Sequence, residues 1–186
     1  MHEHDDDLED ALNLARYRRV AVFAATHNHG KNVQMAFPAR DPTVIGVSSC
    51  DHEGNLSSSA ALAKEDKTNF SALGENIPAF WMRDWRCPSS QQLSGSSFAV
   101  PIVVGVYATT LLAARLSFRL DSEAKLREKL MSNAVRARLM LVLSMKNEAT
   151  KYRSLTTKLL WNEEEGWTAA EIKRHIDHVD KGIPYH

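Results

Sequence analysis

The sequence predicts an α/β protein with a mostly parallel sheet, and three of its features support this prediction. Residues 20–25 and 44–48 are short, continuous apolar runs, which are typical of strands buried on both faces of a parallel sheet. A helical pattern at 5–18 precedes the first run, and the apolar segment 97–119 has the length of a long helix. Because helices alternate with buried strands in this order, we expect a three-layer fold with helices around the sheet.

The first helix is predicted from apolar residues at helical spacing, among them Leu8, Leu12 and Ala15. The acidic run at 5–7 suits the positive end of a helix dipole. Polar residues at 27–32 then indicate a loop between the two predicted strands.

The middle of the chain, residues 51–95, has a less regular pattern. Pro78 and Pro88 indicate loops, and the small polar residues at 89–95 indicate another loop. We therefore assign no helix or strand to this region.

The C-terminal part is predicted to be helical. Asp121 or Ser122 is a candidate cap for a helix that reaches about residue 146, and a further helix is expected over 168–179. We therefore divide the chain into residues 1–119, which hold the sheet, and a helical extension at 120–186.

The composition is that of an ordinary globular domain. The 186 residues include 23 basic and 23 acidic side chains, so bulk electrostatics do not favour a nucleic-acid partner. Cys50 and Cys87 are too few for a disulfide framework and lack the spacing of a metal site. We expect idle thiols, no metal and no cofactor.

The location is predicted from two features. The chain starts with an acidic segment, where a signal peptide would be basic and then apolar. Pro101, Gly105 and Arg115 interrupt the most apolar stretch, 98–116, which is therefore interpreted as a buried helix and not as a membrane span. We expect a cytoplasmic protein without a membrane partner.

The segment 95–105, G-S-S-F-A-V-P-I-V-V-G, is the most informative one for chemistry. A serine in the first turn of a helix lies at the positive end of the helix dipole, which favours negative charge developing nearby. Gly95 lets the chain approach a substrate backbone closely. By itself, however, the pattern also fits a buried helix with a capping serine.

This segment resembles the nucleophile motif of the subtilisin-like serine peptidases, G-T-S-M-A-x-P-h-x-x-G. Both glycines, the serine, the alanine and the proline match at the same offsets. The resemblance implies a fold of the subtilisin type and hydrolysis of peptide bonds through an acyl-enzyme, with Ser97 as the nucleophile.

A second segment, A-A-T-H-N-H-G, resembles the family's A-A-G-N-x-G and follows a predicted strand. The resemblance makes Asn28 the oxyanion-hole donor, which stabilises the charge of the tetrahedral intermediate. It also implies that Ala24, Ala25 and Thr26 line the substrate pocket called S1.

A third segment supports the order of the motifs. Residues 37–47 resemble the family's Y-P-A-x-x-P-x-V-I-x-V stretch, which also follows the asparagine loop. Together the matches cover about residues 8–115, and the sequence looks closest to the intracellular fungal members.

The other two members of the triad have no counterpart. The family's aspartate and histidine motifs precede the asparagine loop, and 1–186 contains neither D-x-G after an apolar strand nor H-G-T-x-x-A. His27 and His29 flank Asn28, and we interpret both as loop residues, with His27 in the place of a family glycine. Without a base, Ser97 is an ordinary alcohol.

Three hypotheses follow. The chain is a fragment of a complete peptidase and inactive alone, which we prefer, and the sheet is then incomplete at its N-terminal side. Alternatively, it is a non-catalytic pseudopeptidase that acts as a peptide-binding or regulatory module, or a second chain supplies the complementing N-terminal half.

Overall fold

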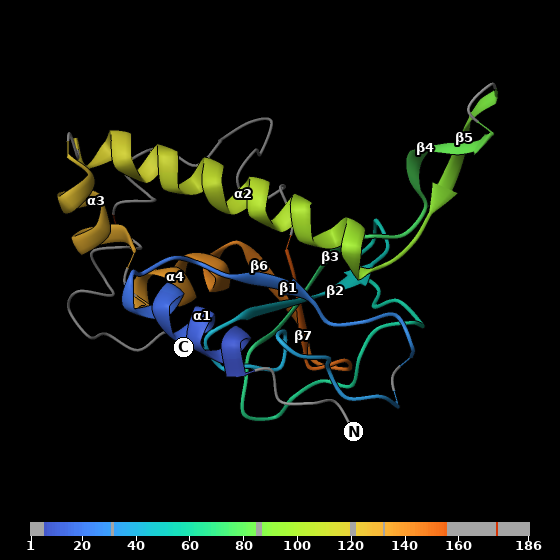
Figure 1. Ribbon diagram of the computed structural model, residues 1–186, viewed down its shortest axis with the longest axis horizontal. Coiled ribbons are helices and arrows are strands. Elements are labelled where there is room, and N and C mark those ends of the chain that lie inside the picture. The colour runs from blue at the N-terminus through green and yellow to red at the C-terminus, as the bar shows by residue number, and fades with distance from the viewer. Residues whose placement is uncertain are drawn as a thin grey trace.

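The computed structural model describes residues 6–30, 32–84, 87–119, 122–131, 133–155 and 174 (Figure 1). Along the chain the elements are α1 (Asp6–Tyr17), β1 (Phe23–Ala25), β2 (Ile45–Cys50), β3 (Asn69–Leu73), β4 (Ile77–Asp84), β5 (Cys87–Leu93), α2 (Ser96–Ser117), α3 (Glu123–Leu130), α4 (Asn133–Val142), β6 (Ser144–Asn147) and β7 (Tyr152–Leu155). Helices and strands do not alternate strictly, because five strands follow α1 and three helices precede β6. The α/β class is nevertheless confirmed, because helices pack against a mostly parallel sheet.

The main sheet has five strands in the order β1-β2-β3-β7-β6. Four of them are parallel neighbours, with Ala24 opposite Gly46 at the β1–β2 pair and Ser48 opposite Ser71 at the β2–β3 pair. Only β6 runs antiparallel, to β7. The predicted strand at 20–25 is shorter than expected and only partly buried, because β1 is the last strand on its side of the sheet.

Helix α2 lies across one face of the sheet, and α1 lies on the other side, near β1 (Figure 1). The core is formed where α2 meets β2 and β3, through buried residues such as Val103, Val47 and Phe70. Ser96–Leu116 is long and apolar enough to span a membrane, and 28% of it is buried. The core helices of soluble proteins can have the same length and composition. The inner face of α2 is thus a core face, whereas much of its outer face is uncovered.

A chain of buried hydroxyls links β1 to β7 through the middle of the sheet. Thr26 Oγ1 lies 2.6 Å from Ser48 Oγ, which donates to Tyr152 Oη at 3.2 Å. The Tyr152 hydroxyl donates in turn to the carbonyl oxygen of Ala61 at 3.1 Å. Because each hydroxyl of this chain has a partner, Thr26, Ser48 and Tyr152 are buried without leaving these groups unsatisfied. The buried hydroxyl of Ser49, also on β2, has no partner among the described residues.

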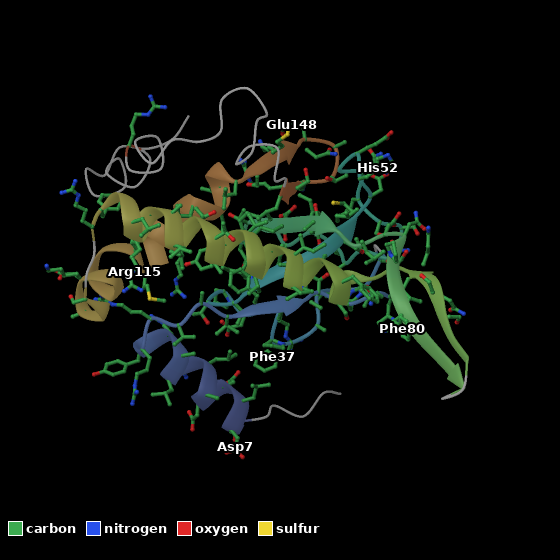
Figure 2. The ribbon with its side chains drawn as sticks, turned by 90° about the horizontal axis from the view of Figure 1, so that it is seen from above. Asp7, Phe37, His52, Phe80, Arg115 and Glu148 are labelled. Carbon is green, nitrogen blue, oxygen red and sulfur yellow. The ribbon has the colours of Figure 1, made fainter. Side chains whose placement is uncertain are left out.

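The region 51–95 differs from the prediction, because β3, β4 and β5 lie in it. Strands β4 and β5 form a hairpin that projects from the body of the molecule, with Phe80 75% exposed (Figure 2). Pro78 and Pro88, which indicated loops, lie within this hairpin. A two-stranded ribbon consists only of edge strands, and edge strands tolerate proline.

The predicted helical extension at 120–186 is helical only in part. Ser122 caps α3 by accepting from the backbone N–H of Lys125, as predicted. The helix expected to reach residue 146 is broken into α3 and α4, and residues 144–155 form two strands of the main sheet. The sheet therefore continues past the boundary set at residue 119, and the prediction of a purely helical extension at 120–186 is corrected. The helix predicted over 168–179 falls outside the described residues, apart from Arg174.

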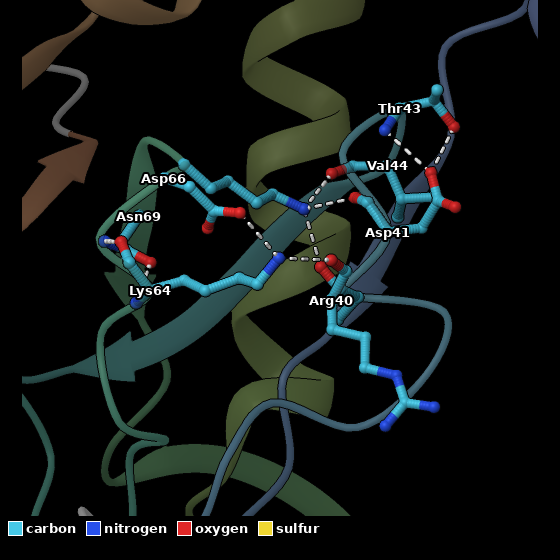
Figure 3. A network of polar contacts seen from close by, with 9 residues as sticks. Arg40, Asp41, Thr43, Val44, Lys64, Asp66 and Asn69 are labelled. Carbon is cyan, nitrogen blue, oxygen red and sulfur yellow. Dashed lines mark hydrogen bonds and ion pairs between the residues drawn. The ribbon is translucent and has the colours of Figure 1, made fainter.

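A lysine fastens the loop that leads into β2 (Figure 3). The ammonium of Lys67 donates to the carbonyl oxygens of Ala39, Asp41 and Val44 at 2.6, 2.6 and 2.5 Å. Lys64 lies beside it, but it reaches only the carbonyl of Arg40 at 3.4 Å, besides its exposed ion pair with an aspartate. Lys67 thus holds three main-chain acceptors of one loop.

Cys50 is a free thiol at the end of β2 and is 2% exposed. Burial raises the pKa of this thiol to about 11. The structure thus has Cys50 as a buried thiol outside any disulfide, and the side chain of Cys87 lies outside the described part of the structure.

Candidate functional site

The loops that follow β1 and β3 meet at the start of α2. Asn28 lies three residues beyond the end of β1, and Gly74 directly follows β3. The backbone N–H of Gly95, the residue before α2, donates to the carbonyl oxygen of Gly74 at 2.8 Å. The carboxyl ends of parallel strands are where open α/β sheets place their sites, so this junction is the candidate active site.

Ser97 is the second residue of α2, and its side chain is exposed. No hydrogen bond of its hydroxyl is found among the described residues. The first turn of α2 contains no acidic residue, so no carboxylate of this turn opposes the positive end of the helix dipole. The dipole favours an anion beside Ser97.

Asn28 is anchored by the residue next to Ser97. Its Oδ1 accepts from the backbone N–H of Ser96 at 2.8 Å and lies 3.0 Å from the Ser96 hydroxyl, which is buried. Because Oδ1 takes these contacts, the amide nitrogen Nδ2 is left as a donor with no partner among the described residues. The sequence assigned no role to Ser96, and the structure makes it the residue that orients this amide.

Two glycines allow the junction to close. Gly95 has φ of 156°, and a Cβ at this position would lie 3.0 Å from Asn28 Nδ2. A Cβ on Gly74 would lie 2.8 Å from the carbonyl oxygen of Gly95 and 2.7 Å from Cβ of Ser49. Both positions therefore require glycine for space, and Gly74 was not identified from the sequence.

His27 is a loop residue, as interpreted from the sequence, and both of its ring nitrogens are engaged. Nδ1 accepts from the backbone N–H of His29 at 3.0 Å, so Nε2, which lies 3.0 Å from the carbonyl oxygen of Val33, is assigned as the N–H donor. The ring also stacks on that of His29, with centroids 5.5 Å apart. Neither nitrogen of His27 is available to take a proton from Ser97 in this arrangement.

The backbone of His27 has φ of 140°, a value that side-chain-bearing residues rarely adopt. We expect His27→Gly to be more stable than His27→Ala by about 1–2 kcal/mol, because both lose the ring contacts but only glycine relieves a strain of order 1–3 kcal/mol. Urea unfolding of the two variants measures the difference. Equal stability, or a more stable alanine variant, would show that the loop is unstrained, since alanine ordinarily gains about 0.4–1 kcal/mol over glycine.

The three residues predicted to line the S1 pocket lie just before Asn28. Ala24 and Ala25 are partly buried in β1. The Thr26 side chain is fully buried in the hydroxyl chain, and its backbone N–H and carbonyl bind Val47 and Ala36. Thr26 is thus committed to the fold, so a contribution to a substrate site would come from Ala24 and Ala25.

No candidate base contacts Ser97 within the part of the chain that the structure describes. This part contains three of the eight histidines, His27, His29 and His52, and none of them is hydrogen-bonded to Ser97. The remaining ones, His2, His4, His175, His178 and His186, lie outside it. The described site therefore holds a nucleophile and an amide donor but no group that activates the nucleophile.

The family comparison matches the Subtilase family over residues 3–176, which is most of the chain. The "Subtilisin-like protease het-Q2" of the fungus Podospora anserina is 40% identical over 106 residues, covering 56% of this chain and 29% of the relative. The "Minor extracellular protease Epr" of Bacillus subtilis is 30% identical over 128 residues, covering 69% of this chain and 18% of the relative. The chain thus spans less than a third of the length of these curated relatives.

Solved structures show the same fold. The patellamide maturation protease PatA superposes with a TM-score of 0.60 at 24% identity, over 89% of this chain and 59% of that chain. The parallel sheet, the start of α2 beside Gly74 and Gly95, and the family match all indicate the same family. The chain therefore belongs to the subtilase family of serine peptidases.

Proposed function

We propose that this chain supplies the nucleophile and the oxyanion hole of a serine endopeptidase. The proposal is carried by one observation: the exposed Ser97 hydroxyl stands at the start of α2, next to the residue that holds the Asn28 amide. Ser97 Oγ attacks the carbonyl carbon of a peptide bond, and the oxygen that becomes negative accepts from Asn28 Nδ2. The C–N bond then breaks, the amine leaves with a proton, and water releases the acyl group from Ser97.

The proton from Ser97 requires a base, and we place this base in polypeptide outside residues 1–186. In subtilases the aspartate and histidine of the triad precede the nucleophile along the chain. Among the residues that the structure describes, no histidine is bound to Ser97. This chain alone is therefore expected to be inactive, and the complementing segment belongs to the same longer protein or to a partner.

The surface next to Ser97 exposes apolar side chains, as a surface does that another segment of polypeptide covers. Val104 and Leu112 are 40% and 55% exposed and lie on the same side of α2 as Ser97 by helical spacing. A Cβ on Gly105 would touch nothing within 4 Å, so this helix face is open. Strand β1 is also at the end of the sheet, and no described strand pairs with its outer edge. Exposed apolar faces and open strand edges are unfavourable unless they are covered.

A segment that covers the outer face of α2 would also reach Ser97, because the exposed positions continue along the helix to that residue. The same docking would therefore bury the apolar face and complete the triad. The substrate is proposed to bind as an extended strand beside the sheet, near Ala24 and Ala25 of β1. A cytoplasmic location remains a prediction from the sequence.

The test is a single polypeptide in which the N-terminal part of the Podospora anserina relative's peptidase domain precedes residue 1. We expect a fluorophosphonate probe to label this fusion, and Ser97→Ala to abolish the labelling. Ser58→Ala, which removes an exposed serine elsewhere, should leave it unchanged. A folded fusion that shows no labelling, or labelling that persists in Ser97→Ala, would refute the proposed role of Ser97.

A second candidate function is a non-catalytic module that binds peptides or regulates a partner. It is favoured by His27, which replaces the glycine of the family motif and whose ring nitrogens bind the loop itself. In this case the fusion folds and binds an extended peptide, but the probe does not label the fusion and the fusion does not hydrolyse the peptide.

A further inference from the structure

Strand β1 has a row of backbone groups along its outer edge that no described strand pairs with. Successive residues of a strand direct their backbone N–H and C=O groups to opposite sides. Val22 O accepts from β2 at 2.8 Å and Thr26 N donates to β2 at 3.1 Å, so the even-numbered residues of 22–26 face β2. Phe23 and Ala25 therefore direct their N–H and C=O groups away from β2, where no partner is found among the described residues.

This edge lacks the features by which proteins protect open strand edges. Charged side chains and prolines on an edge strand hinder its pairing with another strand. The other edge strands of the described structure carry such residues: Pro78 on β4, Pro88 on β5 and the exposed Lys146 on β6. Residues 20–26, V-A-V-F-A-A-T, contain neither a charge nor a proline. The outer edge of β1 is therefore suited to pairing.

An apolar flank of α2 lies along the same edge. The ring of Tyr107 packs against that of Phe23 on β1, with centroids 5.3 Å apart. Val100, Val104 and Leu111 lie on the same side of the helix as Tyr107 by helical spacing. Val104 is 40% exposed, whereas Tyr107 is buried. A strand beyond β1 would bury the exposed part of this flank.

Helix α1 indicates the direction that such a strand would take. The helix leads into β1 and lies on the face of the sheet opposite α2 (Figure 1). A helix in this position is typical of the crossover between two neighbouring parallel strands. Because β2 takes the inner side of β1, the strand before such a crossover would pair with the outer side.

We infer, on the basis of the proposed function, that the complementing polypeptide adds a parallel, uncharged strand to the outer edge of β1. A parallel strand ends at the same edge of the sheet as β1, whose carboxyl end leads to Asn28. The loop after the added strand therefore lies near Asn28 and Ser97, where the proposed function needs the rest of the site. The strand is recognised by backbone hydrogen bonds to Phe23 and Ala25 and by apolar burial against α2.

Amide hydrogen exchange at single-residue resolution tests this docking mode. The two samples are the full chain alone and the Ser97→Ala form of the fusion in which the relative's N-terminal part precedes residue 1. In the chain alone, the amides of Phe23 and Ala25 are expected to exchange at least about 100-fold faster than that of Thr26, which donates to β2. In the fusion, all three amides are expected to be protected to within about tenfold of one another.

Two results would overturn the proposal. The first is exchange of the Phe23 and Ala25 amides as fast in the folded fusion as in the chain alone, with Thr26 protected in both. The second is protection of these amides in the chain alone, which can be measured whether or not the fusion folds. Protection that persists on dilution would mean that the chain closes this edge itself, and protection that dilution removes would place a second copy there.

A proline variant gives an independent measurement. Ala25→Pro removes an N–H that faces outward, so it costs the chain alone no hydrogen bond to β2. We expect it to lower the melting temperature of the fusion by at least about 2–4 °C more than that of the chain alone, because only the fusion loses a hydrogen bond. Ala25→Ser, which keeps the N–H, is the matched control and should shift both melting temperatures equally. Equal shifts for Ala25→Pro as well would overturn the proposal.

These measurements separate the docking mode from the proposed function, because neither of them depends on a reaction of Ser97. Labelling of the parent fusion without protection of Phe23 and Ala25 would refute the docking mode and leave the proposed function standing. Protection of both amides without labelling would refute the proposed role of Ser97 and leave the docking mode standing.

Discussion

Asn28→Asp is expected to slow fluorophosphonate labelling of Ser97 in the fusion by about 10²–10³-fold, the size known for removal of one oxyanion-hole donor in subtilisin itself. The substitution is nearly isosteric, and a carboxylate oxygen can still accept from the backbone N–H and hydroxyl of Ser96, as Oδ1 does now. What is lost is the Nδ2 donor, which is replaced by a negative oxygen facing the developing oxyanion. The labelling rate therefore reports the donor and not the anchoring of the loop.

The matched control for this substitution is Asn147→Asp. Asn147 also uses its Oδ1 to accept from a backbone N–H, that of Ala149 at 3.1 Å, but it lies on β6, away from the start of α2. We expect its labelling rate to equal that of the parent fusion. If Asn28→Asp labels within about threefold of the parent while Asn147→Asp is unchanged, Asn28 is not the oxyanion donor, because a lost donor costs far more.

The parts of the fold that were predictable are those in which local pattern and tertiary burial agree. Helix α2 was found within one or two residues because its small and apolar residues form a continuous run that ends at a loop. Strand β2 was found because both of its faces are buried, so its apolar residues do not alternate with polar ones. The position of Ser97 at a helix start followed from the same segment, together with the resemblance.

The elements that were missed have patterns decided by distant neighbours. Strand β7 reads Tyr-Arg-Ser-Leu, and it is a strand because β3 and β6 pair with it on either side. Strand β5 begins Cys-Pro-Ser-Ser, which locally favours a loop, and it is held by antiparallel pairing with β4. Context of this kind outweighs intrinsic strand preference, which spans only about 1 kcal/mol.

The same reason explains the residues of the site that the sequence did not reveal. Ser96 looked like a mild replacement of a family threonine, yet it orients Asn28, which lies 68 positions earlier in the chain. Gly74 follows β3, a strand that the sequence analysis did not assign, and a side chain at Gly74 is excluded by the nearness of Gly95 and Ser49. The only feature of the sequence that could have indicated Gly74 is a glycine that follows a partly apolar stretch. Both roles arise from contacts between segments far apart in sequence.

Lys67→Met is expected to cost about 1.5–3 kcal/mol of unfolding free energy at pH 7, the range for hydrogen bonds to a charged group. Burial lowers the pKa of the Lys67 ammonium to about 8, so at pH 7 it is still charged and donates to all three carbonyl oxygens. Methionine keeps a similar length but leaves these acceptors without their donor. For a chain of this size the melting temperature should fall by about 2–4 °C for each kcal/mol.

Lys64→Met is the matched control, because Lys64 is in the same loop and points toward the same carbonyl cluster (Figure 3). Its contacts are a 3.4 Å approach to Arg40 O and an ion pair with Asp66 in which both side chains are exposed, so less than about 1 kcal/mol is at stake. If both variants unfold at the same urea concentration, the three short contacts of Lys67 do not stabilise the loop. If only Lys67→Met is destabilised, the entry into β2 is held by a side chain from the loop before β3. The placement of Asn28 beyond the neighbouring strand β1 would then depend on that contact as well, because β1 pairs with β2 directly.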